Sequence, residues 1–408
     1  MSEDKPVLGH LKVLDISSFI FGPGSSMIMS EFGADVIKIE SPGLGDPFRH
    51  VHKAPPFMPS EFAYLWQQDN RNKRSVALDM KNPEGYEILL QLVRQADVLV
   101  TNFPPNVLER LKIRYEDLTP HNEKLIYGQI TGYGEKGPDA NKPGFDATAY
   151  WARTGLMDIV RTAEADPTMS GPGMGDHPSA MTMYAAIMTA LYKLERTGKG
   201  SKVSSSLMAN GLWAASSALS GILAGTAAAP RSSIKSPRNA LLNHYQTRDE
   251  RWVLIIVMME DKNWPAFAAA LGGDDLVADP RFAQRKARLA NATELAQTIS
   301  SIFGSQDYAY WEPRLLAHNV TFSVVQTLEE AASDPQALLN GMIVDVEGQK
   351  HGRGQAVSSP FWVQGSDKVQ ARVGPELGAN GPDILRDLGY DEKTVSRMIS
   401  DGVIEVSK

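Results

Sequence analysis

The residues best suited to chemistry lie in one short stretch, Gly171 to His177, which leads into a long apolar segment. Its aspartate, Asp176, stands where a helix is expected to begin. Asp176 therefore admits two interpretations. It could be a structural cap of the helix. It could also be a nucleophilic carboxylate beside backbone N–H groups of the glycine loop and the helix end, which would stabilise a developing oxyanion.

The segment after Asp176 has the pattern of a buried helix that ends near Arg196. Pro178 falls in the first turn, where its missing N–H costs little. Apolar side chains follow at spacings of two to four residues, which predicts a helix with a wide apolar face: Met181, Met183, Tyr184, Ile187, Met188, Leu191 and Leu194.

Composition narrows the functional classes. The chain has 408 residues and a net charge of −7 with no basic stripe, which argues against a nucleic-acid partner. It has no cysteine, which excludes disulfides, thiolate metal sites and a cysteine nucleophile. Its eight histidines do not show metal-ligand spacing. No apolar run approaches the ~20 residues of a membrane span, and the N-terminus is polar. We expect a cytoplasmic protein without a structural metal and without a membrane contact.

The N-terminal part must supply the elements that position this stretch, and it alternates between strand and helix patterns. Residues 11–17 and 34–40 are predicted strands with a helix over 22–33 between them. Gly22-Pro23-Gly24 in the turn departs from the dinucleotide-binding fingerprint. Further strands are predicted over 73–80, 97–103 and 124–134, with helices over 83–96 and 104–111. Residues 41–72 are predicted to be a long loop that covers a site.

This alternation predicts a parallel sheet with helices on its faces. Ligands of such sheets bind beyond the carboxyl ends of the strands. The loops after Asp15, Glu40, Phe103 and Gly132 are therefore the first places to look for a ligand.

The rest of the chain predicts a second, smaller unit. After a strand at 202–207 and a tightly packed small-residue helix to Gly225, residues 226–240 read as a linker. A hairpin over 244–259 and several helices follow, then strands over 321–327 and 341–348 and two short C-terminal helices. We expect a large α/β domain over 1–225, a small α+β domain over 226–325, and a segment over 326–408 that returns to the large domain.

Several segments together resemble the class III CoA-transferase family (CaiB/BaiF type, similar to formyl-CoA transferase). They occur in the family's order along nearly the whole chain: LKVLDIS, GADVIKIESP, NKRSVALDM, VLVTNF, GQITGYGEKGPDANKPGFD, GMGD, TGKGSKVSSSLM and LRDLGY. The segment from Gln129 to His177 looks closest to the branch that includes cinnamoyl-CoA:phenyllactate and benzylsuccinate CoA-transferases. The resemblance implies a Rossmann-like large domain built from both ends of the chain and an interlocked ring dimer, with linkers near 226–240 and 325–350.

The resemblance also implies a chemistry. Asp176 matches the family's nucleophile, which attacks an acyl-CoA thioester and passes through a mixed anhydride to an aspartyl-CoA thioester. CoA then moves to an acceptor acid, for example from succinyl-CoA to an aromatic or branched carboxylic acid. The CoA thioester is a substrate, and no tightly bound cofactor or metal is implied.

The CoA-binding positions of the family match unevenly. The matching residues are Leu78, Lys81, Asn102, Phe103 and Arg110. Lys81 and Arg110 would meet CoA phosphates, or they are ordinary surface charges. Ile20 and Phe21 stand where formyl-CoA transferase has a Gln-Ala pair, and Ser41 replaces its arginine. An apolar Phe19–Phe21 entry would suit a larger acid than oxalate, but the same three residues could simply pack in the core.

Three residues are expected around the nucleophile, in contact with substrate or supporting the site: Asp146, Gly175 and His177. Asp146 could raise the proton affinity of Asp176 or could cap a helix. Two alternative functions stay open. A 2-methylacyl-CoA racemase of the same family uses a histidine where this chain has Phe145, which favours transfer over racemisation. The chain could also be one subunit of a heteromeric CoA-transferase rather than a homodimer.

Overall fold

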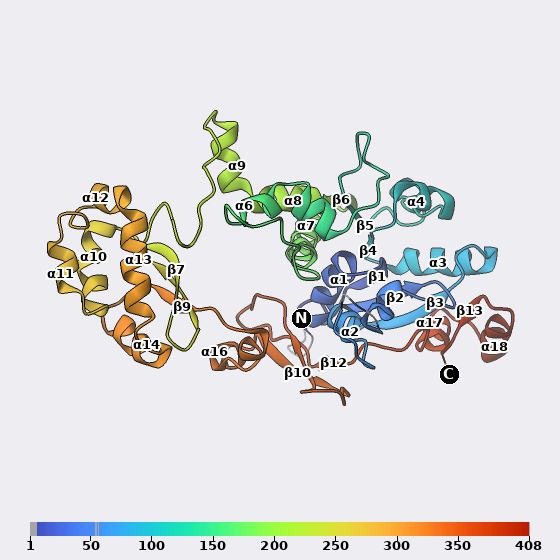
Figure 1. The fold of residues 1–408 in the computed structure, drawn as a ribbon. Helices are drawn as coiled ribbons and strands as arrows, with labels where there is room; N and C mark the ends of the chain where they lie inside the picture. Colours follow the sequence, from blue (N-terminus) through green and yellow to red (C-terminus); the bar gives the residue numbers. More distant parts are fainter. Residues whose placement is uncertain (1–5, 54, 56, 408) are drawn as a thin grey trace. The chain divides into compact units, whose positions relative to one another are not determined.

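A computed structural model describes residues 6–53, 55 and 57–407, and the chain forms two compact units. The first unit is assembled from Met1–Asp158, Met169–Gly225 and Pro335–Lys408, and the second from Ile159–Thr168 and Thr226–Asp334. Figure 1 shows the chain coloured along its sequence, so that the blue and red ends can be followed into the first unit. All of the sequence-predicted site residues belong to the first unit.

The first unit is built on a seven-stranded sheet in the order β13-β3-β2-β1-β4-β5-β6. All neighbouring strands are parallel except β13, which runs antiparallel to β3. The sequence predicts this mixed α/β architecture with a largely parallel sheet. The strands span these residues: β1 (Lys12–Ile16), β2 (Asp35–Glu40), β3 (Arg74–Leu78), β4 (Val98–Thr101), β5 (Ile126–Thr131), β6 (Ser201–Ser206) and β13 (Ile404–Glu405).

Alternation along the strands divides the apolar side chains between two cores. In β1, Val13 belongs to one core, and Leu14 and Ile16 belong to the other. This follows from the two-residue period of a strand, which sends successive side chains to opposite faces. Asp15 and Lys38 are paired in register on β1 and β2, and both are buried on the same face as Val13.

Helices cover both faces of the sheet, as the run of apolar strands requires. The core with Val13 contains α1 (Phe21–Glu31), α7 (Asp176–Thr197), α8 (Leu207–Ala214) and the π-helix η3 (Asp146–Ala152). The core with Leu14 contains the following helices: α3 (Pro83–Gln95), α4 (Pro105–Leu111), α5 (Tyr115–Leu118), α17 (Gly381–Asp387) and α18 (Glu392–Ser400).

Two sequence expectations for the first unit are wrong in detail. The long loop predicted over 41–72 contains the helix α2 (Tyr64–Asn70) and the short 3-10 turns η1 (Pro47–Arg49) and η2 (Val51–Lys53). The small-residue run to Gly225 is two helices, α8 and α9 (Ser216–Leu223), and α9 has no buried residue. Small residues permit close packing, but in the described part of the chain the residues of α9 are only partly buried or exposed.

The first unit also holds a three-stranded sheet in the order β11-β10-β12 and two short helices. Their bounds are: β10 (Ile343–Glu347), β11 (Gln355–Val357), β12 (Ala371–Arg372) and α16 (Pro335–Leu339), with α6 (Leu156–Ile159) at the boundary of the two units.

The second unit has its own core and an antiparallel sheet in the order β7-β8-β9. Its hairpin turns at Arg248-Asp249-Glu250, as the sequence predicts. Its elements are: β7 (Leu242–Gln246), β8 (Trp252–Ile256), α10 (Glu260–Ala270), α11 (Asp274–Ala278), α12 (Arg285–Ala290), α13 (Ala292–Phe303), α14 (Tyr308–Ala317), β9 (Phe322–Val324) and α15 (Leu328–Ala331). Within the described ranges, no helix has the length and apolarity needed to span a bilayer.

Candidate active site

The order of the sheet reverses at β1, whose neighbours β2 and β4 carry the chain in opposite directions, so the loops after β1 and β4 border a crevice. One side chain joins these two loops. Asn102, just after β4, accepts from Ser18 N at 2.9 Å and donates to Ser18 O at 2.7 Å. The loop after β1 is therefore held from the side of β4.

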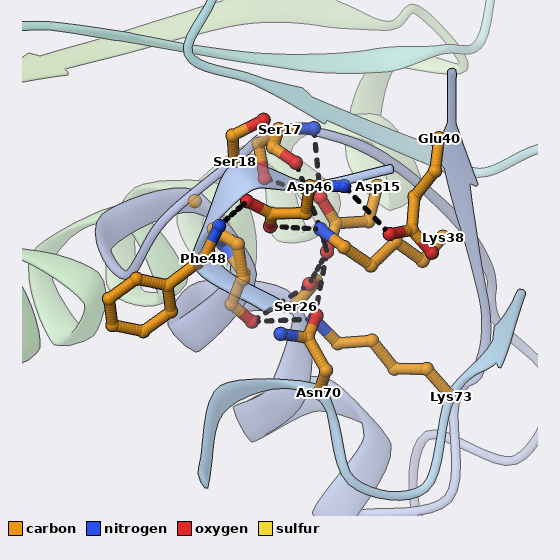
Figure 2. A network of polar contacts seen from close by, with 12 residues as sticks. Asp15, Ser17, Ser18, Ser26, Lys38, Glu40, Asp46, Phe48, Asn70 and Lys73 are labelled. Carbon is orange, nitrogen blue, oxygen red and sulfur yellow. Dashed lines mark hydrogen bonds and ion pairs between the residues drawn. The ribbon is translucent and has the colours of Figure 1, made fainter. Parts of the chain in front are cut away.

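A buried ionic cluster holds the same loop from below (Figure 2). Lys73 Nζ donates to Asp15 Oδ2 at 2.8 Å, to Asn70 Oδ1 at 2.9 Å and to the carbonyl of Pro23 at 2.9 Å. Lys38 Nζ donates to the carbonyl of Ser17 at 2.9 Å. The charges are buried, so they are stable only because each has close partners.

Asp46 connects this cluster to the tip of the loop. Its Oδ2 lies 3.1 Å from Lys38 Nζ, and its Oδ1 accepts from Phe19 N at 3.2 Å. Phe19 has φ 67°, a left-handed conformation that side chains with a Cβ seldom adopt. The contacts of Asp46 and Asn102 therefore fix a strained loop next to the crevice.

The charges of the cluster shift one another's pKa values. Burial raises the pKa of Asp15, but attraction to Lys38 and Lys73 outweighs burial and the net direction is downward. For Lys73, burial dominates over Asp15 and lowers the pKa to about 8. For Lys38, burial is outweighed by Asp15, Asp46 and Glu40, and the net pKa is raised. Asp15 and Lys38 are thus firmly charged in the folded protein.

If Asp176 were the N-cap, helix α7 would begin at His177. The helix instead begins at Asp176 itself. Gly175 is the N-cap, and no side chain makes a capping hydrogen bond there. The interpretation of Asp176 as the N-cap is therefore wrong. Its carboxylate is partly exposed, and it has no hydrogen-bond partner within the described part of the chain. Its place in the first turn puts it near the positive end of the helix dipole.

The glycines of the loop are needed because the chain is tightly packed around it. A Cβ on Gly175 would lie 2.7 Å from Cγ of Tyr150. Gly173 has φ 75°, and a Cβ there would lie 2.9 Å from Nδ1 of His177 and 3.1 Å from Cδ1 of Ile20. Ile20 thus brings the loop after β1 into contact with the glycine loop.

Three N–H groups of the glycine loop are already used. Gly171 N donates to Met174 Sδ at 3.2 Å. Gly175 N donates to Asp146 Oδ2 at 3.3 Å, and Met174 N donates to the carbonyl of Gly171 at 3.4 Å. Among the residues described, the N–H groups of Gly173 and Asp176 have no acceptor.

Asp146 lies close enough to Asp176 for its charge to act on that carboxylate. Its Oδ1 also accepts from Ala147 N at 2.7 Å at the start of η3, so it both supports a helix end and binds the glycine loop. Burial, followed by the negative charge of Asp146, raises the pKa of Asp176 to about 7. The charge of His177 acts in the opposite direction.

His177 bonds through both ring nitrogens, and one partner was not predicted. Nε2 lies 3.1 Å from Asp69 Oδ1, and Nδ1 lies 3.1 Å from the carbonyl of Gly173. Asp69, in α2, is 1% exposed. Asp69 was not predicted as a site residue, because residues 41–72 were predicted to be a loop. Of the three buried residues of α2, Trp66, Asp69 and Asn70, only Trp66 is apolar, so the sequence carries no apolar periodicity that predicts this helix.

Comparison with known proteins places the chain in one family. Residues 8–381 match the family model of CoA-transferase family III. The chain belongs to that family. No three His, Asp or Glu side chains gather as metal ligands in the ranges that the structure describes.

Relatives of this CoA-transferase cover its full length. It is 30% identical to the cinnamoyl-CoA:phenyllactate CoA-transferase of Clostridium sporogenes, over 100% of both chains. It is 30% identical to the succinyl-CoA:glutarate CoA-transferase of Mus musculus, over 98% of this chain and 91% of the relative. The crystal structure of a CAIB/BAIF family protein from Brucella suis has a TM-score of 0.83 and 28% identity, and the match covers 94% of this chain and 100% of that one.

Three aromatic rings of the CoA-transferase pack together around Phe19, in the loop after β1. Phe19 packs edge-on against Phe145 with ring centroids 5.3 Å apart, and against Phe48 at 5.9 Å. Phe145 directly precedes Asp146 and is 56% exposed. The exposed ring gives the CoA-transferase an apolar surface close to Asp176.

The sequence-predicted CoA-binding residues of this CoA-transferase are only partly brought together. Asn102 holds the loop after β1, and Phe103 is half-buried against the core beneath it. Ile20, Phe21 and Leu78 are buried, so their side chains are packed within the protein. Lys81 follows β3 and Arg110 lies in the last turn of α4, and both are exposed. Their role in binding CoA stays a prediction.

Proposed function

We propose that this CoA-transferase moves CoA from an acyl-CoA donor, such as succinyl-CoA, to an aromatic or branched carboxylic acid through an aspartyl-CoA thioester on Asp176. The observation that carries the proposal is the state of the Asp176 carboxylate. It is partly buried at the start of α7, beside two N–H groups without acceptors, and no described residue hydrogen-bonds it. A carboxylate that is poorly solvated and uncommitted is a good nucleophile.

In the first half of the reaction, a carboxylate oxygen of Asp176 attacks the thioester carbonyl of the donor. The C–S bond breaks, which gives a mixed anhydride and CoA thiolate. The thiolate then attacks the side-chain carbonyl of Asp176. The donor leaves as a free carboxylate, and the enzyme holds an aspartyl-CoA thioester.

The second half repeats these steps in reverse with the acceptor. The acceptor carboxylate attacks the aspartyl-CoA carbonyl and releases CoA thiolate, which leaves a second mixed anhydride. The thiolate attacks the acceptor's carbonyl, and the Asp176 carboxylate is regenerated with the new acyl-CoA. One thioester is exchanged for another, so the free energy of the exchange is near balance.

Each tetrahedral intermediate places negative charge on an oxygen. The unoccupied N–H groups of Gly173 and Asp176 are the available donors of the loop, because Asp146 occupies that of Gly175. Fixed backbone donors of this kind typically contribute about 3–4 kcal/mol each to a transition state. They need no reorganisation, since the packing of Gly173 and Gly175 already fixes the loop.

The choice of acid rests on the aromatic surface and on the relatives. Phe145, which is exposed, and Phe19, which is half-buried, offer apolar contact to an aryl or branched side chain, while Phe48 is buried and packs against Phe19. A relative is named for cinnamoyl-CoA and phenyllactate, and another for succinyl-CoA and glutarate. These names support an aromatic acceptor and a succinyl donor for this chain.

The test is to trap the covalent intermediate. The protein is incubated with succinyl-CoA and other acyl-CoAs and treated with hydroxylamine, and the modified residue is located by mass spectrometry. We expect a hydroxamate on Asp176 and a loss of turnover of about 10³-fold or more in Asp176→Asn. Glu195→Gln, an exposed carboxylate on the same helix, is the matched control. Modification at another residue, or none with any donor, contradicts the proposal.

Racemisation is the alternative that the same experiment can include. A racemase exchanges the α-proton of a 2-methylacyl-CoA, so deuterium from solvent would appear in the substrate. Both ring nitrogens of His177 already face acceptors, which leaves no free base on that ring. We therefore expect CoA transfer without deuterium incorporation.

A further inference from the structure

The pair of His177 and Asp69 lies directly beside the nucleophile but takes no part in the steps above. His177 follows Asp176 in α7, and Asp69 reaches it from α2. Helix α1 allows this approach. A Cβ on Gly24 of α1 would lie 3.3 Å from Asp69 Oδ1 and 3.2 Å from the Cβ of Ala180 in α7. Three helices therefore meet closely at this point.

The hydrogen-bond geometry determines the protonation of His177. The carbonyl of Gly173 can only accept, so Nδ1 must donate across its 3.1 Å contact. The Asp69 carboxylate also accepts, so Nε2 must donate across the second 3.1 Å contact. A neutral imidazole carries one N–H and cannot make both bonds. The ring is therefore an imidazolium while Asp69 is ionised.

We propose that Asp69 keeps His177 as a permanent imidazolium, which acts as a positioning residue for the Gly173 turn and as the counter-charge that keeps Asp176 ionised for attack. This inference rests on the proposed role of Asp176. The buried carboxylate of Asp69 is the negative partner of the His177 ring. The other ring nitrogen of His177 donates to the carbonyl of Gly173 and so holds the glycine loop. His177 neither gives nor takes a proton during transfer.

The other charges around the pair agree with this assignment. Burial lowers the pKa of His177, but Asp69 and then Asp176 outweigh burial and raise it to about 9. Asp176 faces Asp146 from η3 and Asp69 from α2, which both favour its protonated form, and His177 alone opposes them. Asp69 also lies near the charge of Lys73.

The test is the pH profile of kcat/KM, which reports the free enzyme. In His177→Gln the counter-charge is lost, so the acid limb set by Asp176 moves to higher pH by about one unit. The loss of kcat/KM in His177→Gln relative to the wild type is then about tenfold larger at pH 6 than at pH 9. His177→Lys keeps a positive charge, and its acid limb stays close to that of the wild type. His121→Gln, on an exposed turn, is the control.

Asp69→Asn provides an independent variant. It removes the charge that holds the imidazolium, so the His177 ring loses its second proton at a lower pH than in the wild type. Ring ¹⁵N NMR of the wild-type protein gives a readout without turnover. We expect the His177 ring, assigned by its loss in His177→Gln, to be doubly protonated at pH 7.5.

The outcomes separate this inference from the proposed function. A neutral His177 ring at pH 7.5 overturns the inference. So does a His177→Gln enzyme that forms the Asp176 hydroxamate but loses activity equally at all pH values, because the role is then purely structural. A wild-type enzyme that forms no adduct on Asp176 contradicts the proposed function itself.

Discussion

The Asp176 carboxylate is partly buried and accepts no hydrogen bond from a described residue, so burial and the neighbouring charges set its proton affinity. Asp146 and burial raise its pKa, and His177 lowers it. The resulting pKa of about 7 means that the carboxylate is about half ionised at neutral pH. At the residue scale, activity should therefore respond to each neighbouring charge in a predictable direction.

The first prediction concerns Asp146→Asn. The amide oxygen can still accept from Gly175 N, but the negative charge is gone. We expect the acid limb of kcat/KM to move to lower pH by about one unit, opposite to His177→Gln. A profile measured from pH 5 to 9 checks this. A shift to higher pH would show that Asp146 does not act on Asp176 through its charge.

The second prediction concerns stability. A folded-state pKa of about 7 lies above the ordinary value of 3.8, so the carboxylate costs stability as the pH rises between these values. Asp176→Asn should therefore stabilise the fold at pH 8 by on the order of 1 kcal/mol, and by nothing near pH 3.5. Thermal unfolding at both pH values, with Glu195→Gln alongside, measures the difference.

Sequence reasoning reached some of these residues and not others, for physical reasons. Asp176 directly follows Gly175, and Asp146 lies two residues after Gly144, in motifs that a resemblance can match. Asp69 lies in no such motif, and only the burial of α2 between α1 and the ring of His177 gives it a role. Likewise, an apolar side chain at Ile20 or Phe21 suits both packing in the core and contact with an apolar ligand. The sequence pattern therefore could not decide between these two roles.

At the scale of elements, the start of α7 is fixed by contacts with η3, α2 and the loop after β1. Tyr150 leaves no space for a side chain at Gly175. The parallel sheet and its helices were predictable from apolar periodicity. The packing of the helix and loop ends against one another was not predictable. It depends on close contacts of backbone atoms, such as those at Gly173 and Gly175, which are formed only in the folded chain.

The third prediction uses two glycines of the same loop. Gly175→Ala would place a Cβ 2.7 Å from the Tyr150 ring, which must displace the start of α7. We expect kcat to fall by about 10²-fold while KM for the acyl-CoA changes little, because the reacting carboxylate moves. Gly171→Ala meets only the flexible Met174 side chain, at 3.3 Å, and should stay near wild type. Equal losses in both variants would contradict this account.

The fourth prediction concerns the ionic cluster in Figure 2. Lys73→Met removes three hydrogen bonds and leaves Asp15 buried with Lys38 at 3.8 Å as its remaining cation. We expect a loss of about 3–5 kcal/mol in unfolding free energy by urea titration. Lys202→Met breaks an exposed pair with Glu135 and should cost less than about 1 kcal/mol. Adding Asp15→Asn to Lys73→Met should recover part of the loss.

At the scale of the whole molecule, large apolar side chains stay exposed on α8 and α9. Trp213 is 78% exposed and Leu223 is 79% exposed. A second surface that packed against these side chains would remove them from water. The resemblance to ring-shaped dimers offers a reason, since a second chain would supply that surface.

The fifth prediction is therefore that the protein is a dimer in solution and that α8 and α9 lie in its interface. Trp213→Asp with Leu223→Asp should shift the sedimentation coefficient toward that of a 44.6 kDa monomer. Arg196→Asp, which is exposed at the end of α7, should leave the assembly intact. A wild-type monomer, or a dimer that survives the double change, would place the interface elsewhere.

The pairing of β13 with β3 has a consequence for how the protein is made. Ile404 lies opposite Leu78, and Asn380 and Gly378 bond Ser75 at the same edge. A nascent chain on the ribosome has every other strand of the large sheet long before these final residues emerge. Until then the β3 edge is open to pairing with foreign chains. Deletion of β13 would leave that edge open permanently and favour aggregation.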